Sequence, residues 1–154
     1  MNPRSIISID PGTAGTGIAI WKYTDFYLGK PCEPYMWSVM YNEFKILYAI
    51  EKLVERLNIA EAYIENAAYM GTSAKGIMVA RKGFLIRLAS FIGKVEHILQ
   101  RHGVKVELVS VMDWKGTMSK EAVIKRISKR LPDFQAESHV WDAVGIGLYK
   151  MGAF

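Results

Sequence analysis

Hydrophobic residues at the start of the chain form two short runs separated by a turn. The first run is rich in isoleucine and ends on Asp10, the pair Pro11–Gly12 follows, and a second apolar run occupies residues 16–21. Short apolar runs bounded by turn residues predict a strand, a tight turn and a returning strand. Asp10 then stands at the carboxyl end of a buried strand, where a charge is costly unless another group neutralises it. A role in capping the turn is the alternative for this residue alone.

The next segments predict a third strand, a helix and a fourth strand. Residues 35–40 are mainly apolar, which predicts an antiparallel meander with the first two strands. From Asn42 to about Asn58, apolar residues recur every three or four positions, as in an amphipathic helix. Residues 60–65 form a short buried strand that ends on Glu65, so the pattern of Asp10 is repeated.

Asp10 and Glu65 are predicted to be neighbours. A right-handed crossover makes the fourth strand parallel to the first, so both acidic ends lie at the same edge of the sheet. Two adjacent carboxylates raise each other's pKa, and a divalent cation with oxygen ligands, such as Mg²⁺ or Mn²⁺, removes the repulsion. The alternative is that Glu65 is a solvated strand end.

The second half of the chain predicts a long helix, an edge strand and two further helices. Residues 77–100 carry an apolar stripe so wide that the helix is either fully buried or shared with a second subunit, and we favour sharing. Residues 104–109 alternate as a fifth strand, and residues 113–116 form a turn. Ser119 caps a helix that runs to about Leu131, and Ser138 caps a final helix. The predicted fold is α/β, with three antiparallel strands followed by two parallel ones and helices on both faces, in a single domain of residues 1–154.

Composition narrows the classes of partner. The chain has 154 residues, a formal net charge of +5 and a pI near 9.3, which favour an anionic partner. Cys32 is the only cysteine, so no internal disulfide can form. No apolar stretch approaches the ~20 residues that span a bilayer. We therefore expect a cytoplasmic protein without a membrane partner.

Basic residues gather in two regions. No acidic residue lies between Glu65 and Glu96, and the loop at residues 69–76 combines an aromatic ring, glycines, hydroxyls and a lysine, as suits a phosphate backbone with a stacked base. Ordinary packing of Tyr69 is equally compatible with this pattern. The second region spans residues 115–130, where Lys115 and Lys120 lie in loop and cap positions. The candidate DNA contacts are Tyr69, Ser73, Lys75, Arg81, Lys82, Lys115 and Lys120.

His139 and Asp142 stand three residues apart at the start of the final helix. Residues at this spacing share one helix face, and here that face continues into an apolar segment expected to pack on the sheet. A lone histidine on such a face is usually structural. Because this pair points toward an edge that already presents two acids, a metal site is favoured.

These motifs together resemble the RuvC family of Holliday junction resolvases, within the RNase H-like superfamily. The likeness rests on Ile-Asp-Pro-Gly-Thr at residues 9–13, on Ile-Glu at 64–65 and on His-x-x-Asp-Ala-Val-Gly-Ile at 139–146. It implies that Asp10, Glu65, His139 and Asp142 bind the catalytic metals. It also implies that Lys115 and Lys120 lie near the scissile strand. In the family, an aromatic residue that acts as a wedge usually stands three residues after the glutamate. In this chain that position is Ala68, and Tyr69 follows one residue later. In residues 35–41 and 114–116 the chain resembles phage-encoded members of the family more than the housekeeping bacterial enzyme.

The resulting hypothesis is a metal-dependent endonuclease that resolves Holliday junctions and other branched DNA in recombination and repair. As the resemblance implies, a homodimer makes paired nicks, with two Mg²⁺ or Mn²⁺ ions per subunit activating water against the scissile phosphate. A non-catalytic branched-DNA-binding module of the same fold is the alternative. An actin-like ATPase also begins with an Asp-x-Gly-Thr hairpin, but it needs two such domains to enclose a nucleotide.

Overall fold

The fold is built on one five-stranded sheet with the strand order β3-β2-β1-β4-β5. The computed structural model describes residues 4–12, 14–66 and 83–154. The strands are β1 (Arg4–Asp10), β2 (Thr16–Lys22), β3 (Met36–Met40), β4 (Asn58–Glu65) and β5 (Lys105–Val109). β1, β2 and β3 pair antiparallel, whereas β1, β4 and β5 pair parallel. The predicted mixed sheet is therefore confirmed.

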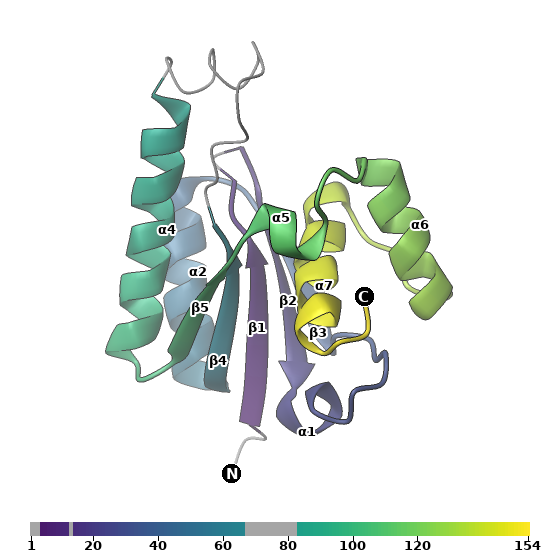
Figure 1. The fold of residues 1–154 in the computed structure, drawn as a ribbon. Coiled ribbons are helices and arrows are strands. Elements are labelled where there is room, and N and C mark those ends of the chain that lie inside the picture. Colours follow the sequence, from purple (N-terminus) through teal and green to yellow (C-terminus); the bar gives the residue numbers. More distant parts are fainter. Residues whose placement is uncertain (1–3, 13, 67–82) are drawn as a thin grey trace.

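Helices cover both faces of this sheet (Figure 1). α2 (Glu43–Arg56) and α4 (Phe84–Arg101) pack on one face, and α7 (Ser138–Lys150) packs on the other with α6 (Lys120–Arg130) outside it. Two single-turn helices, α1 (Tyr23–Phe26) and α5 (Val111–Trp114), complete the described part of the chain. The sheet consequently separates two hydrophobic cores.

The central strand β1 is buried on both faces. Ile6 faces the core beneath α7, whereas Ile7 and Ile9 face the core beneath α2 and α4, because successive side chains of a strand point to opposite sides. A strand covered on both faces is expected to be mainly apolar. Here Ile6, Ile7 and Ile9 are interrupted only by Ser8, which is buried as well. Asp10 ends it, and so lies where the buried part of the strand stops.

The wide apolar stripe of α4 is used within the chain itself. Phe91, Ile92, Val95 and Leu99 are buried with α2 against the sheet, and Phe91 is only 2% exposed. The expectation that a second subunit covers this stripe is therefore wrong for these residues. An interface between subunits would have to use other side chains of α2 and α4.

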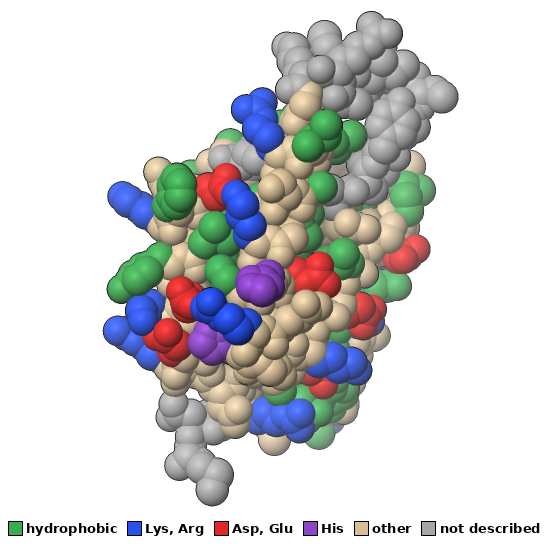
Figure 2. Space-filling model, turned by 90° about the vertical axis from the view of Figure 1, so that its left-hand side faces the viewer, with side chains coloured by type: hydrophobic (Ala, Val, Ile, Leu, Met, Phe, Trp, Pro, Cys, Tyr) green, Lys and Arg blue, Asp and Glu red, His purple; other side chains and the backbone are tan. Residues whose placement is uncertain are grey.

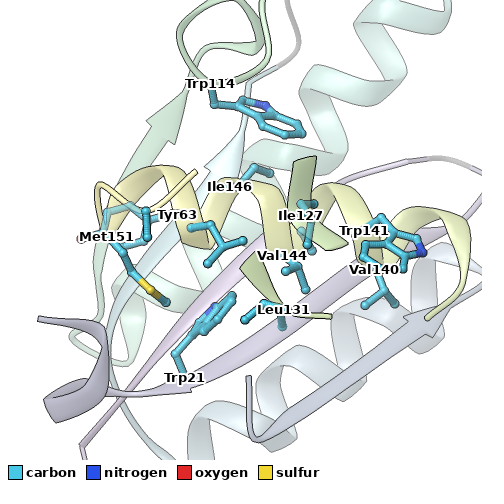
Figure 3. Close-up of a cluster of buried hydrophobic side chains, with 14 of the residues drawn as sticks. Trp21, Tyr63, Trp114, Ile127, Leu131, Val140, Trp141, Val144, Ile146 and Met151 are labelled. Atoms are coloured by element: carbon cyan, nitrogen blue, oxygen red, sulfur yellow. The ribbon is translucent and has the colours of Figure 1, made fainter. Parts of the chain in front are cut away.

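Two glycines let α7 lie directly on β2. A Cβ atom added at Gly17 would be 2.0 Å from the carbonyl oxygen of His139, and one added at Gly147 would be 2.3 Å from the ring of Trp21. Trp21 is fully buried, and its indole N–H donates a 2.9 Å hydrogen bond to Ser8 Oγ. Figure 3 shows Trp21 among the side chains beneath α7. This close approach sets the height of the helix above the sheet.

The ends of the helices differ in part from expectation. Ser119 caps α6 as predicted, because its Oγ accepts a hydrogen bond from the backbone N–H of Ala122. The predicted cap of α7 is wrong by one residue: Ser138 is the first helical residue, and Glu137 is the N-cap without a side-chain cap bond. Trp114 ends α5 rather than standing in an open turn. None of the helices described by the structure is both long and apolar enough to cross a membrane.

The contact between α7 and β2 yields a stability prediction. Gly147→Ala should lower the free energy of unfolding by about 1–3 kcal/mol, the usual cost of overpacking a core, because the added methyl group meets Trp21. Gly93→Ala on α4 is the matched control, since nothing lies within 4 Å of its added Cβ and alanine favours a helix by about 0.5–1 kcal/mol. Urea denaturation of both variants measures the difference. Equal stabilities would contradict the described packing of α7.

Candidate active site

Three carboxylates from three elements meet at one edge of the sheet. Asp10 and Glu65 end the adjacent parallel strands β1 and β4, where Ile9 pairs with Ile64 just before them. Asp142 comes from α7, which crosses β1 and β2. Asp10 is 7% and Asp142 8% exposed, so both are charges largely removed from water. The two strand-end acids are therefore neighbours, as the sequence predicted.

His139 joins this cluster through Asp10. Its Nδ1 lies 3.1 Å from Asp10 Oδ2, and its side chain is 39% exposed to solvent. Gly17 makes this contact feasible, because the absence of a side chain there lets the first turn of α7 approach β2. His139 and Asp142 thus reach the same acidic edge, with Asp142 buried and His139 at its rim.

Two lysines supply the counter-charges of the carboxylates. Lys120, the first residue of α6, donates to Asp142 Oδ2. Lys115 follows α5 and places its Nζ 3.6 Å from Glu65 Oε2 and 3.8 Å from Asp142 Oδ1. The lysines predicted to belong to the site are therefore located between its acids, where they offset the repulsion of like charges.

Burial and like charge raise the pKa of the strand-end acids. Burial is the largest cause for Glu65, the charge of Asp10 adds to it, and the pKa rises to about 7 despite Lys115 and a hydrogen bond from Trp114. Burial also raises the pKa of Asp10, while its hydrogen bond with His139 acts in the opposite direction. The same hydrogen bond raises the pKa of His139. The site therefore binds protons at a pH where isolated carboxylates are ionised.

One oxygen of Asp142 shows that the cluster suits a cation. Oδ1 is buried and has no hydrogen-bond partner, and the ammonium of Lys115 is too distant, at 3.8 Å, to donate to it. A buried acceptor without a partner costs about 1–3 kcal/mol. Carboxylate oxygens and one imidazole are ligands for Mg²⁺ or Mn²⁺, so the chemistry of these residues fits a divalent ion. No three of them have ligand atoms within 4.8 Å of one another, so they would have to move closer together to share one ion.

Trp114 is a site residue that sequence reasoning missed. Its indole N–H donates a 2.8 Å hydrogen bond to Glu65 Oε2, and its ring lies 4.7 Å from the ammonium of Lys115. Gly145 of α7 makes room for the ring, because an added Cβ would be 2.4 Å from it. Figure 3 shows Trp114 at the end of the core, above α7. The available signal was a tryptophan directly before a candidate lysine, whose polar N–H needs a partner when buried.

A second group with metal-ligand chemistry lies on the surface of α2 and α4. Glu51, Glu55 and His102 bring ligand atoms within 4.8 Å of one another, and they are the only three residues to do so in the described ranges. Their carboxylates already have cationic partners, Arg101 for Glu51 and Lys52 for Glu55. This group is separate from the sheet edge and was not predicted.

Several predicted DNA contacts lie outside the described residues. These are Tyr69, Ser73, Lys75, Arg81 and Lys82. Only Lys115 and Lys120 of that predicted set fall within the described part of the chain, and both lie at the acidic edge.

Comparisons with known proteins give matches by structure only. No family model matches the sequence, and no curated protein matches it. Among solved structures, RuvC of Thermus thermophilus in complex with a Holliday junction substrate superposes with a TM-score of 0.67, 17% identity and 97% coverage of both chains. A second structure of Thermus thermophilus RuvC gives a TM-score of 0.67 and 18% identity, with 97% of both chains covered.

A viral protein shares the same architecture. The resolvase of Fowlpox virus, solved in complex with substrate Holliday junction DNA, gives a TM-score of 0.62 and 14% identity, with 97% of this chain and 99% of that chain covered. At such identities the likeness concerns the fold. The chain therefore has the fold of these resolvases over nearly its whole length.

Proposed function

We propose that the chain is a structure-selective DNA endonuclease that resolves Holliday junctions and other branched DNA. The observation that carries the proposal is the convergence of Asp10, Glu65 and Asp142 with Lys115 and Lys120 at one sheet edge. Two structures that share this fold over 97% of the chain were solved with Holliday junction substrates. The net charge of +5 agrees with an anionic partner.

Asp10, Glu65 and Asp142, with His139 at the rim, would hold one or two Mg²⁺ or Mn²⁺ ions. A bound divalent ion supplies an activated water and stabilises negative charge on phosphate oxygens. The Oδ1 of Asp142, buried without a hydrogen-bond donor, and the raised pKa of Glu65 support this assignment, because a bound cation would satisfy the first and favour the charged form of the second. Trp114 orients Glu65 by its hydrogen bond.

Lys115 and Lys120 would serve the phosphate rather than the acids once DNA is bound. Both side chains lie at the acidic edge and keep part of their exposure, 21% for Lys115 and 31% for Lys120. An ammonium on a flexible stem can move from a carboxylate to a nearby phosphate oxygen, where charge develops in the reaction. The lysines therefore position the scissile phosphate against the carboxylates.

We also propose a homodimer, because paired nicks need two sites. Exposed hydrophobic side chains on α2 and α4 supply a candidate interface: Phe44 is 83%, Tyr48 63% and Ile86 75% exposed. Figure 2 views this side of the molecule and shows hydrophobic side chains among acidic and basic ones. A symmetric dimer would pair this patch with itself. The patch replaces the buried stripe of α4 as the proposed interface.

Cleavage of a labelled four-way junction tests the proposed function. Wild-type protein should cut the junction with Mg²⁺ or Mn²⁺ and leave linear duplex uncut. Asp10→Asn should abolish cleavage yet retain binding, because it removes a ligand charge from the acidic edge and leaves the basic residues unchanged. Asp113→Asn, at an exposed acid of α5, is the matched control and should cut like wild type. Binding without cleavage by the wild type would favour the non-catalytic module.

The raised pKa of Glu65 predicts a pH-dependent stability. Because burial disfavours its charged form, the metal-free protein should lose stability as the pH rises from about 4.5 through about 7. Mn²⁺ should then raise the melting temperature more at a pH of about 7.5 than at about 5.5, where protons on Glu65 and His139 compete. Glu65→Gln should remove much of this difference. Equal shifts at both values would contradict a metal site at Glu65.

Light scattering tests the proposed interface. Phe44→Glu should shift a micromolar dimer toward monomer, because it places two like charges across a symmetric contact. Leu28→Glu is the control: this residue is 69% exposed, and it follows α1 rather than lying on α2 or α4. A dimer that is unchanged in Phe44→Glu would place the interface elsewhere. A monomeric wild type would contradict the proposed dimer.

A further inference from the structure

A cavity of about 500 Å³ opens beside the acidic edge, between β3 and the loop that leads into α7. Val39 and Val140 form its apolar lining, Trp37 presents an aromatic ring, and Gln135 and Glu137 contribute polar groups. Cavities of about 300–1,000 Å³ with an apolar lining and a few polar groups are typical ligand sites. Neither the fold nor the proposed chemistry assigns this one.

The walls of the cavity are fixed by buried contacts. Trp37 is 41% exposed, and Phe134 packs edge-on against its ring with 5.0 Å between the ring centroids. Phe134 itself is buried and packs against Trp141, whose indole N–H donates a 2.9 Å hydrogen bond to the carbonyl oxygen of Ala136. The loop before α7 is therefore held in place, and a partly exposed tryptophan ring is presented to solvent without a rearrangement.

The cavity adjoins the candidate active site through Tyr41 and Glu137. The Tyr41 hydroxyl donates a 3.2 Å hydrogen bond to Glu137 Oε2. A Cβ atom added at Gly15 would lie 3.0 Å from the ring of Tyr41 and 3.1 Å from the ring of His139, so these two rings are neighbours above Gly15. A ligand in the cavity would thus lie near His139, which is bonded to Asp10.

The chemistry of the lining selects among the parts of a nucleic acid. A phosphate would meet the carboxylate of Glu137 and be repelled, whereas a base offers a flat face for Trp37 and a polar edge for Gln135 and Glu137. A carboxylate accepts hydrogen bonds from an exocyclic amino group, which cytosine, adenine and guanine carry and thymine lacks. We propose that this cavity binds one unpaired nucleobase bearing an amino group, beside the scissile phosphate of branched DNA. This inference rests on the proposed function.

Substrates with a single abasic nucleotide test the cavity by changing only the DNA. Asp10→Asn protein, which binds without cutting, is titrated with four-way junctions in which each nucleotide near the crossover is made abasic in turn. At one position, loss of the base should weaken binding about tenfold, the scale of one base stacked on an aromatic ring. The same abasic substitution should have almost no effect when Trp37→Ala is added, because the ring that stacks the base is then absent.

Three variants keep this experiment interpretable. Trp37→Phe should retain the dependence on the base, since phenylalanine still stacks. Met36→Ala is the matched control, because Met36 lies on the same strand but lines a different pocket, beside α2. Glu137→Gln should reduce the preference for cytosine or adenine over thymine at the identified position. Thermal melts verify that each variant is folded.

The outcomes separate the cavity from the proposed function. The protein could bind and cut the junction while Trp37→Ala removes the effect of an abasic nucleotide at no position. That result overturns the cavity proposal and leaves the nuclease proposal intact. Failure of the wild type to bind any branched DNA overturns both. Photocrosslinking of 5-iodocytosine at the identified position should yield a peptide containing Trp37, and a crosslink elsewhere would also overturn the cavity proposal.

Discussion

Three carboxylates held close together and away from water are the constraint on which this structure depends. Asp10, Glu65 and Asp142 repel one another, and each loses hydration by burial. The fold tolerates this arrangement because Lys115 and Lys120 lie among the acids and His139 is bonded to Asp10. Hydrogen bonding is incomplete, since the buried Oδ1 of Asp142 has no donor. A buried carboxylate oxygen without a donor, among two other acids, is the physical basis for assigning a cation site.

The hydrophobic core and the acidic edge form one continuous piece of structure. Trp114 belongs to the hydrophobic core around α7, yet its indole N–H is bonded to Glu65. Gly145 allows that ring to pack against α7, and Gly17 brings the first turn of the same helix onto β2. The position of α7 therefore sets the relative placement of Asp142, His139 and the strand-end acids. A change in helix packing far from the acids would alter the distances among them.

The fold is retained at very low sequence identity because few positions constrain it strongly. Superposition with resolvases covers 97% of the chain at 14–18% identity. Cores accept many apolar side chains of similar volume, provided that the pattern of buried positions is kept. Substitutions at the surface are freer still, and the candidate base cavity beside Trp37 lies at such a surface.

Local patterns in the sequence were sufficient for the sheet and for most of the acidic edge. Asp10 and Glu65 each end an apolar run, and the three-residue spacing of His139 and Asp142 places both on one helix face, so neighbouring residues carry the signal. The tertiary structure decided the rest: the hydrogen bond of Trp114 to Glu65 joins residues 49 positions apart, and that of Tyr41 to Glu137 joins residues 96 apart. It also decided that Phe91 faces the protein's own core. The physical reason is that periodicity shows which side of an element is apolar, whereas only the packing of distant segments determines what covers that side.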